Sequence, residues 1–380
     1  MNMKKINIVN FILAFTVTAF IGCENAEYEV KDNNVYLSDA TTSEAKVVVM
    51  EGNINIDVNI RLAKKLDHDV ELYIKINPTL LEEYNKANAT EYNLIPNIEI
   101  PDKGKVIIPA GEIGALCRIP LADFDMKGKR YAISVELSDV ATKGIERSNT
   151  LSNFVYLISK PLITSVAVMK GYNEKMVRTA PATLWGITTK EWSLECLTNM
   201  SGYSNNNQAI FNMGSKDHEI YIRFGDANSP YNYLQIKTLG GQVETKRDLE
   251  PKKWYHWAFV YDGKTLTVYR DGEFNVKFEP PMPKGGSVRF DYVEMISSGS
   301  YFRDQCKMSQ VRLWKKAISR DQIKNNMHFS IDPTNPNLIG YWPMNEGKGN
   351  TFADITGNGH NGTADENILI NWEHNIRFDK

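Results

Sequence analysis

Apolar side chains fill both sets of alternating positions between Trp254 and Tyr261, and a second alternating segment follows as far as Glu273. Successive side chains of a strand point to opposite faces, so both faces of this first predicted strand are expected to be buried. Asp262-Gly263 favours a hairpin turn between the two strands, because glycine accepts the positive φ that a tight turn needs. A strand with two apolar faces belongs inside a sandwich of sheets. The segment contains no catalytic motif.

Strict alternation of apolar and polar positions marks three earlier segments: 54–62, 70–76 and 131–137. One face of each predicted strand is therefore buried and the other is in water, as in an antiparallel sandwich. One helix is predicted to interrupt these strands, with Pro78 near its start and Leu81 and Tyr84 on one side.

A shift in composition divides the chain. All seven tryptophans of the 380 residues follow position 184, which indicates two domains with different cores. Lys160-Pro161 is the natural boundary, because proline ends strand pairing and stiffens the connection. We therefore predict a first domain over 35–160 and a second over 161–380.

The second domain is also predicted to consist mostly of strands: 192–197, 209–213, 219–224, 233–237 and 308–314, besides the hairpin. Ser319 and Gln322 have the spacing of a capping box, which predicts a short helix with Ile323 on its inner side. A glycine-rich turn region follows at 346–362. The sequence shows no internal repeat, which excludes solenoids and propellers.

The N-terminus has the pattern of a targeting segment. Lys4-Lys5 precede an apolar run from Ile8 to Ile21, which is too short to span a bilayer comfortably and is typical of a secretory signal. The run ends in FIGC, which resembles a bacterial lipobox and implies cleavage before Cys23 and acylation of its thiol. A plain signal peptide with an incidental cysteine is the alternative. We expect a lipoprotein signal peptide over 1–22 and a tether over 23–34. Its acidic start resembles the surface-export signal of Bacteroidetes lipoproteins, which implies the outer face of the outer membrane.

Charge and cysteines exclude other classes. The formal net charge is −2 and no basic run or basic stripe with interleaved aromatics occurs, so nucleic acid is not an expected partner. Three cysteines remain after Cys23, and an odd number cannot all pair within the chain. We expect no disulfide framework, although a Cys196–Cys306 pair stays open.

The first domain resembles a known family. LLEEYNKANATEYNLIPN, then KVIIPAG and then YAISVELSD, are similar to a domain of unknown function at the N-terminus of many Bacteroidetes surface lipoproteins. The same domain fronts some chitinase-like endoglycosidases that release N-glycans. This resemblance implies an immunoglobulin-like β-sandwich and a place in a glycan-harvesting system, and it implies no catalytic residues.

Segments of the second domain resemble the laminin-G-like, concanavalin A-like jelly roll of bacterial surface proteins: EWSLE at 191–195, 254–273, VRLW at 311–314 with AIS at 317–319, and 340–362. The resemblance implies an all-β chain in which two stacked antiparallel sheets follow the first sandwich. It also implies ligand sites on the concave face or at the loop rim, in a lectin-like or adhesive module.

Catalytic motifs are missing from the sequence. Glycosidases need two carboxylates placed across a sugar, and the pattern Glu-apolar-Asp-apolar-x-Glu of concanavalin-like enzymes does not occur. Glu191 and Glu195 are four residues apart with nothing acidic between them, so we interpret them as part of a solvated strand face. Zinc-protease and serine-hydrolase motifs are absent as well. We expect a protein that is not an enzyme.

A calcium site is a further hypothesis. Asp354 and Asn358 lie in the tight loop DITGNGHNG, whose carboxylate, amide and carbonyl oxygens are the ligands that Ca²⁺ prefers. The alternative, which we favour, is that Asp354 and the glycines only shape a turn. Any structural calcium would also draw on other loops, through Asp226 or Asp304.

Sugar recognition combines a flat aromatic ring with amide and charged groups that bind hydroxyls. Three loop stretches and one irregular segment have this composition, and they supply the glycan-binding candidates Tyr203, Asn206, Trp185, Tyr231, Tyr233, Tyr301 and Arg303. The alternative for each is a surface loop whose aromatic ring covers the edge of the core. The tryptophans within alternating strands are assigned to the core.

The first functional hypothesis is a non-catalytic, lipid-anchored glycan-binding protein of the cell surface. Its expected ligand is a host or dietary glycan, and its expected partner is an outer-membrane transporter complex. The second is an adhesin or assembly subunit that binds protein, because the same jelly roll serves protein partners elsewhere. The third is a glycoside hydrolase with an unrecognised site.

Overall fold

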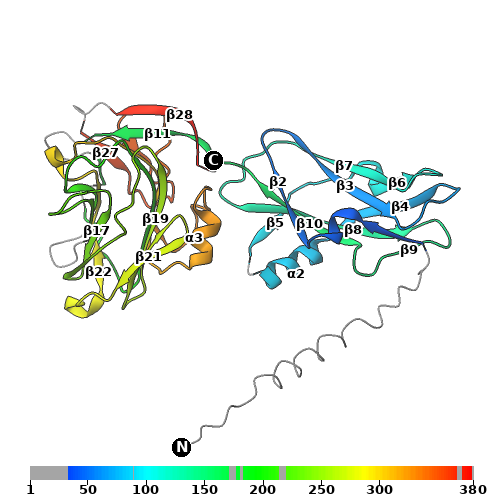
Figure 1. Ribbon diagram of the computed structural model, residues 1–380, viewed down its shortest axis with the longest axis horizontal. Coiled ribbons are helices and arrows are strands. Elements are labelled where there is room, and N and C mark those ends of the chain that lie inside the picture. The colour runs from blue at the N-terminus through cyan, green and yellow to red at the C-terminus, as the bar shows by residue number, and fades with distance from the viewer. Residues whose placement is uncertain are drawn as a thin grey trace, which may run out of the picture.

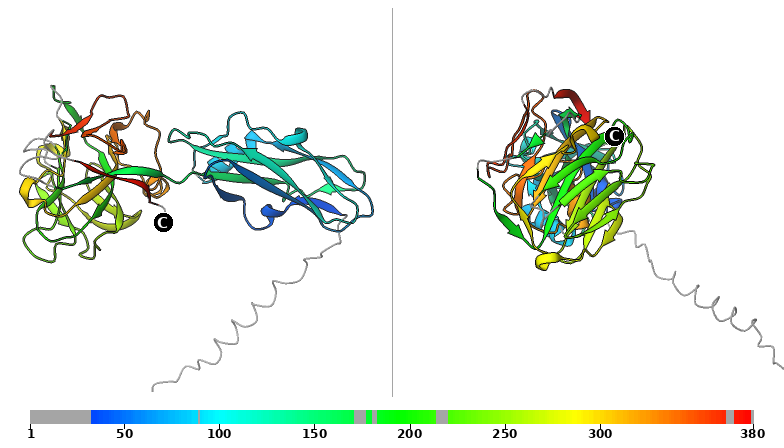
Figure 2. Two further views of the ribbon diagram at one scale, coloured as in Figure 1. Left: turned by 90° about the horizontal axis from the view of Figure 1, so that it is seen from above. Right: turned by 90° about the vertical axis from the view of Figure 1, so that its left-hand side faces the viewer.

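The computed structural model describes residues 33–88, 90–170, 177–179, 183–213, 220–365 and 370–378. The predicted signal peptide, Cys23 and nearly all of the tether lie outside the described residues. The described chain forms two strand-rich bodies placed end to end (Figure 1), and a view from above shows the same arrangement (Figure 2). Within this part, no helix is long and apolar enough to cross a membrane.

The first domain is a β-sandwich, as predicted. Its described strands form one sheet in the order β7-β3-β1-β9 and another in the order β2-β10-β8-β4-β6, with β5 beside β8. Their bounds are β1 (Asn34–Leu37), β2 (Ala45–Val49), β3 (Ile54–Leu62), β4 (Val70–Ile76), β5 (Tyr92–Leu94), β6 (Lys105–Ile108), β7 (Gly114–Leu121), β8 (Arg130–Val140), β9 (Glu146–Arg147) and β10 (Asn153–Ser159). Alternating residues of β3 are buried between the two sheets, which is the strict pattern seen in the sequence.

The helix predicted near Pro78 is α2 (Pro78–Asn88), which places Leu81 against Ala132 and Val155 outside the sandwich core. β9 pairs with Asn34, the first residue of β1, at the end of this domain that is remote from the second domain (Figure 1). The tether therefore enters the molecule at that remote end.

The second domain stacks two larger sheets, which confirms the predicted jelly roll. In the described part, sheet C has the order β21-β20-β19-β14-β24-β11-β28, with β25 beside β24, and sheet D has the order β18-β17-β16-β15-β23-β12-β27-β26. Strands β13 and β22 pair separately. The bounds are β11 (Ile163–Met169), β12 (Val177–Arg178), β13 (Ile187–Thr189), β14 (Trp192–Met200), β15 (Gln208–Met213), β16 (Ile220–Phe224), β17 (Leu234–Thr238), β18 (Gly241–Glu244), β19 (Trp254–Tyr261), β20 (Leu266–Arg270), β21 (Glu273–Phe278), β22 (Val288–Phe290), β23 (Val293–Met295), β24 (Cys306–Trp314), β25 (Leu338–Trp342), β26 (Thr351–Phe352), β27 (Gly362–Ala364) and β28 (Asn371–Arg377).

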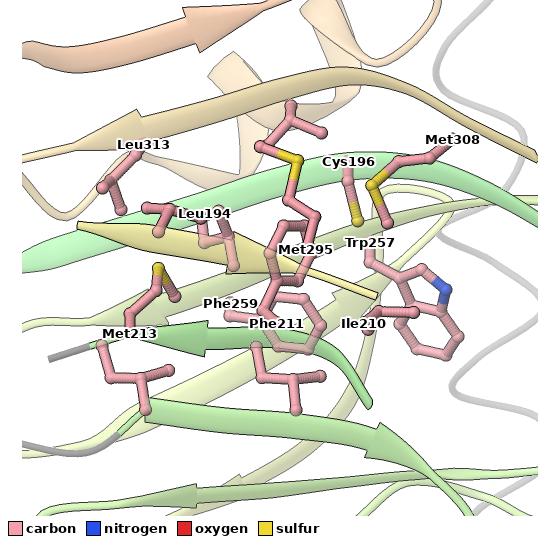
Figure 3. Close-up of a cluster of buried hydrophobic side chains, with 14 of the residues drawn as sticks. Leu194, Cys196, Ile210, Phe211, Met213, Trp257, Phe259, Met295, Met308 and Leu313 are labelled. Atoms are coloured by element: carbon pink, nitrogen blue, oxygen red, sulfur yellow. The ribbon is translucent and has the colours of Figure 1, made fainter. Parts of the chain in front are cut away.

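Both faces of β19 are buried, as its sequence predicts. Trp257 and Phe259 point into the core between the sheets, where they meet residues such as Phe211 of sheet D (Figure 3). Ala258 and Val260 point the other way, into a second apolar cluster on the outer face of sheet C. Both faces of β19 are therefore buried because a third layer covers the outer face of sheet C.

That third layer is the segment 315–337 with the short helix α3 (Arg320–Asn326). Ser319 caps the helix, because its hydroxyl accepts a hydrogen bond from the backbone N–H of Gln322. Ile323 and Ile331 pack against Trp314 of sheet C. In Figure 1, α3 lies on the side of the jelly roll that faces the first domain, while β17 and β27 lie on the far side.

The three described cysteines, Cys117, Cys196 and Cys306, are free and buried. The pair left open between Cys196 and Cys306 is therefore not formed. Burial raises the pKa of both of these thiols. All three cysteines are small residues of the core. This agrees with the expectation that the protein has no disulfide framework.

Candidate functional site

The outer face of sheet D, which turns away from the first domain, is polar and open. Strand β16 shows why: Ile220, Ile222 and Phe224 are buried in the core, while Tyr221 and Arg223 between them are half-buried on the outside. Strand β17 has the same alternation, with Leu234 and Ile236 in the core and Gln235 and Lys237 on the outer side, where Lys237 is half-buried but Gln235 is buried and forms hydrogen bonds with Arg223 and Asp226. No described helix covers these positions, in contrast to sheet C.

A continuous line of polar residues crosses this face. Cross-strand partners share a face of a sheet, and the register pairs Arg178 with Glu294, Glu294 with Asn212, Asn212 with Tyr221, Tyr221 with Lys237, and Lys237 with Gln242. We call these six residues the polar row. It crosses six neighbouring strands and spans about 24 Å at about 4.8 Å between strands. This length suits an extended ligand of several units.

One end of the polar row is fixed and the other is free. Arg178 forms an ion pair with Glu294, and the Asn212 side-chain amide donates to the same carboxylate at 3.0 Å. The side chains of Lys237 and Gln242 have no partner among the described residues. The row thus offers ordered groups beside groups that are available to a ligand.

A hydrogen-bonded cluster joins the polar row to the loops at one end of the sheet. Arg223 donates to Asn207 at 2.9 Å and to Asp226 at 2.6 Å, and it also donates to Gln235. The hydroxyl of Tyr221 donates to Asn207 at 2.9 Å. Loops 201–207 and 225–233 are therefore held to the strands that carry the row.

The loop 299–305 joins the same end. Asp304 accepts hydrogen bonds from the backbone and hydroxyl of Ser204 and from Gln208, and the Asn205 amide donates to the Tyr301 carbonyl at 3.0 Å. The three loops 201–207, 225–233 and 299–305 form what we call the rim. The structure thus brings together most of the candidates that the sequence placed on separate loops.

The candidates on the rim differ in what they can contact. Tyr301 is 54% exposed and Arg303 is exposed, so both can meet a ligand. Asn206 and Tyr231 are half-buried. Tyr203 packs on Phe224 at 5.4 Å between ring centroids, and burial raises the pKa of its hydroxyl. Tyr203 therefore acts mainly as a support for the rim, which was the alternative stated for each aromatic.

Two candidate placements need correction. The prediction that Tyr233 offers a free aromatic face is wrong, because Tyr233 is fully buried and the Arg247 guanidinium lies 4.1 Å from its ring centroid. Trp185 does not join the rim. It stacks on His360 at 3.9 Å, and its backbone N–H donates to Asp291 at the opposite end of the sheet.

The loop that holds Asp354 is shaped by hydrogen bonds within the protein. The carboxylate of Asp354 is nearly buried and accepts from the backbone N–H groups of Tyr341, Thr356 and His360, while the Asn358 amide donates to two carbonyls. These contacts are those of a shaped turn. Among the described residues, no group of three or more His, Cys, Asp or Glu side chains could hold a metal. Asp226 and Asp304 are likewise engaged by donors.

Glu195 corrects the interpretation of its strand as a solvated face. It is 1% exposed on the covered outer face of sheet C, where it lies 3.7 Å from Arg312 and 3.5 Å from His256, and accepts from the Trp314 indole at 2.9 Å. Burial opposes its charge, but Arg312, His256 and Trp314 outweigh this and hold the pKa of Glu195 below its usual value. A buried carboxylate under a third layer cannot reach a substrate.

The sequence reasoning missed the polar row and this buried ion cluster. Both carry a signal in the alternation: polar side chains at 221, 223, 235 and 237, and at 195, 256 and 312, occupy every second position of otherwise apolar strands. The alternation alone did not tell which of these faces is open.

Comparison with known proteins agrees with this architecture. Residues 173–324 match the model of a laminin-G-type family described as the concanavalin A-like lectin/glucanases superfamily, and residues 31–144 match the model of an N-terminal domain family. These matches confirm both resemblances that the sequence suggested. A search with the whole sequence found no match among curated proteins.

A solved structure has the same fold. A crystal structure from Bacteroides ovatus, of a protein named as a candidate for carbohydrate binding, is 21% identical, with a TM-score of 0.64 over 91% of this chain and 99% of that one. EndoBT-3987 of Bacteroides thetaiotaomicron, solved with a Man5GlcNAc product, is 22% identical, with a TM-score of 0.29 over 33% of this chain and 30% of its own. The first of these structures shows the two-domain fold.

Proposed function

We propose that this protein is a non-catalytic glycan-binding protein, and that the polar row and the rim form its binding surface. The observation that carries the proposal is the polar row: an open sheet face on which amide, charged and phenolic groups line up across six strands. The concanavalin A-like domain and the named role of the Bacteroides ovatus neighbour support carbohydrate as the ligand.

The chemistry of the surface suits sugars. Carboxamide, guanidinium, ammonium and phenol groups hydrogen-bond to sugar hydroxyls, and an exposed ring such as Tyr301 can pack against the C–H face of a sugar. The surface is shallow, so the affinity of one site is expected to be weak. Many copies on one cell surface would offset that weakness.

The absence of a catalytic pair supports binding without hydrolysis. The polar row contains a single carboxylate, Glu294, which is engaged by Arg178 and Asn212. A glycosidase needs a second acidic group across the sugar, one to donate a proton and one to attack or activate water. Glu191 and Glu195, the two carboxylates four residues apart in the sequence, lie elsewhere: Glu195 is on β14 of sheet C and Glu191 directly precedes that strand.

We further propose that Cys23 carries the lipid that anchors the protein to the outer face of the outer membrane. The charged start, the apolar run and the Gly22-Cys23 pair support this placement. In this setting the protein would pass captured glycan to an outer-membrane transporter of the same utilisation system. Labelling of cells with a palmitate analogue, with Cys23→Ala as the control, tests the anchor.

The binding proposal is tested on a glycan array of host and plant glycans. The double variant Tyr221→Ala with Lys237→Ala removes two hydrogen-bonding groups of the polar row, and we expect affinity for the retained glycan to fall about tenfold or more. The matched control is Lys277→Ala, an exposed lysine on β21 of the other sheet, which should leave affinity unchanged. Equal retention of wild type and double variant, or no retention at all, would overturn the proposal.

A further inference from the structure

A large hollow lies between the two domains. It has a volume of about 870 Å³, and it is lined by 90–93 and 128–130 of the first domain and by positions between 314 and 337 of the second. A second hollow of about 440 Å³ shares Tyr92, Gly128, Lys129, Arg130 and Asn325 with it. We call the two hollows together the interdomain cleft. Each of the two hollows has a volume in the range of small-molecule sites.

Several polar side chains face the interdomain cleft with nothing to bind. The side-chain amides of Gln322, Asn325 and Asn337 have no hydrogen-bond partner within the described part of the chain, and neither do the charged groups of Lys316 and Asp321. All five lie on the segment that covers sheet C. Amides both donate and accept hydrogen bonds, which matches the dual character of hydroxyl groups.

The charges of the larger hollow cancel. Its lining carries three cationic and three anionic side chains: Lys129, Arg130, Lys316, Glu91, Asp321 and Asp332. One of these pairs, Lys129 with Asp332, already faces across the domain boundary at 3.9 Å. A balanced lining gives no net field to attract an anion or a cation. The ligand that fits such a lining is neutral and rich in hydroxyls.

An aromatic surface completes the cleft. Tyr92 lines both hollows and is half-buried, with Arg130 at 5.8 Å and Tyr84 at 6.4 Å from its ring centroid. Phe329 lines the smaller hollow from the second domain. Rings beside unpartnered amides are the combination that sugar binding uses.

Few contacts hold the two walls at their present distance. Arg130 of the first domain donates to the Asn325 carbonyl and, at 3.1 Å, to the Asn326 side chain. Gly128 touches the second domain so closely that a Cβ atom there would lie 2.0 Å from the Ile331 carbonyl oxygen. A side chain at position 128 would therefore have to push the two walls apart.

We propose that the interdomain cleft is a second glycan site, which binds a neutral oligosaccharide through Gln322, Asn325 and Asn337 and contacts both domains at once. This inference rests on the proposed function only in that both surfaces bind glycans. The polar row lies on the opposite face of the jelly roll, so the two sites are independent and one protein can hold a glycan at each.

The test is isothermal titration calorimetry of the full two-domain chain with mannopentaose, xylopentaose, maltopentaose and chitopentaose. The triple variant Gln322→Ala, Asn325→Ala, Asn337→Ala should lose about tenfold or more in affinity for the pentasaccharide that binds. Asn55→Ala with Asn59→Ala, two exposed amides on β3, is the matched control and should change nothing. Because none of the five amides is buried, all variants are expected to fold.

Two further variants separate the sites. Gly128→Ala should lower the same affinity by wedging the domains apart without removing any amide, while Tyr221→Ala with Lys237→Ala should leave it unchanged. Loss with the polar-row variant alone would overturn the cleft proposal and retain the proposed function. Loss with the cleft variants alone would support the cleft site whatever the fate of the polar row. No heat with any pentasaccharide, or heat unaltered by the triple variant, overturns the cleft proposal.

Discussion

The outer faces of sheets C and D carry similar patterns of polar side chains but differ in their exposure to solvent. Each carries charged and amide side chains at alternating strand positions. On sheet C these groups are covered by 315–337, and Glu195 and Arg312 are almost completely buried. On sheet D the corresponding groups form the polar row, and all of them except Glu294 remain at least partly exposed. The comparison shows that a polar strand face indicates a binding surface only where no other segment of the chain covers it.

Buried charge makes the covered face fragile. Arg312 is 0% exposed, and besides its ion pair with Glu195 it donates to the carbonyls of Asn326, the last residue of α3, and of Phe329, three residues further on. The ion cluster therefore ties the third layer to the sheet. The stability of an open face does not depend on its ion pairs in this way, because water solvates a charge that loses its partner.

The largest expected effect is that of Glu195→Gln. The variant leaves the Arg312 guanidinium buried without a countercharge, and we expect the free energy of unfolding of the second domain to fall by about 3–5 kcal/mol. Denaturant unfolding followed by tryptophan fluorescence measures it, because every tryptophan lies in this domain. Glu250→Gln breaks the exposed pair with Lys253 and should cost no more than about 0.5 kcal/mol. Equal losses of unfolding free energy in the two variants would show that the buried ion pair is no more important for stability than the exposed one.

The same residue predicts a pH dependence. The pKa of Glu195 in the folded protein lies below its ordinary value of 4.5, so the unfolded chain binds its proton first as the pH falls. The stability that Glu195 contributes is present above pH 4.5 and is lost as the pH falls through its folded pKa. Unfolding curves of the wild type should therefore weaken on acidification below pH 4.5 more steeply than those of Glu195→Gln. Parallel pH profiles would contradict the lowered pKa.

A smaller effect is expected at the cap of the third layer. Ser319→Ala removes the hydroxyl that accepts from the Gln322 N–H, which costs about 1 kcal/mol for a helix N-cap. Hydrogen exchange should quicken in 319–337 and stay unchanged in β15 to β17 of sheet D. Faster exchange throughout the domain would show that the third layer does not unfold separately.

The smallest effect is expected on the open face. Lys237→Ala with Gln242→Ala removes two side chains that form no hydrogen bond or ion pair with the described residues, and stability should change by no more than about 0.5 kcal/mol. Thermal unfolding measures this. A loss above 1 kcal/mol would show that the polar row supports the fold, and the contrast with sheet C would fail.

The sequence was sufficient for the elements and the fold, and insufficient for the site. Alternation predicted β3, β4, β8 and β19, and the spacing of Ser319 and Gln322 predicted α3, because these signals are local. Tyr233 shows the limit: its position in an aromatic loop favoured exposure, but Arg247, fourteen residues later, covers its ring. The polar row depends on the register of six strands, and two of them, β12 and β23, are far from the other four in the chain, so no local pattern contains it.

The end-to-end placement of the domains gives the first sandwich the role of a spacer. The tether joins the end of that domain beside β9, and sheet D lies at the opposite end of the molecule (Figure 1). With Cys23 anchored in lipid as proposed, the first domain becomes a stalk that holds the polar row at the tip of the protein. The length of the first domain would then set how far from the membrane the polar row lies.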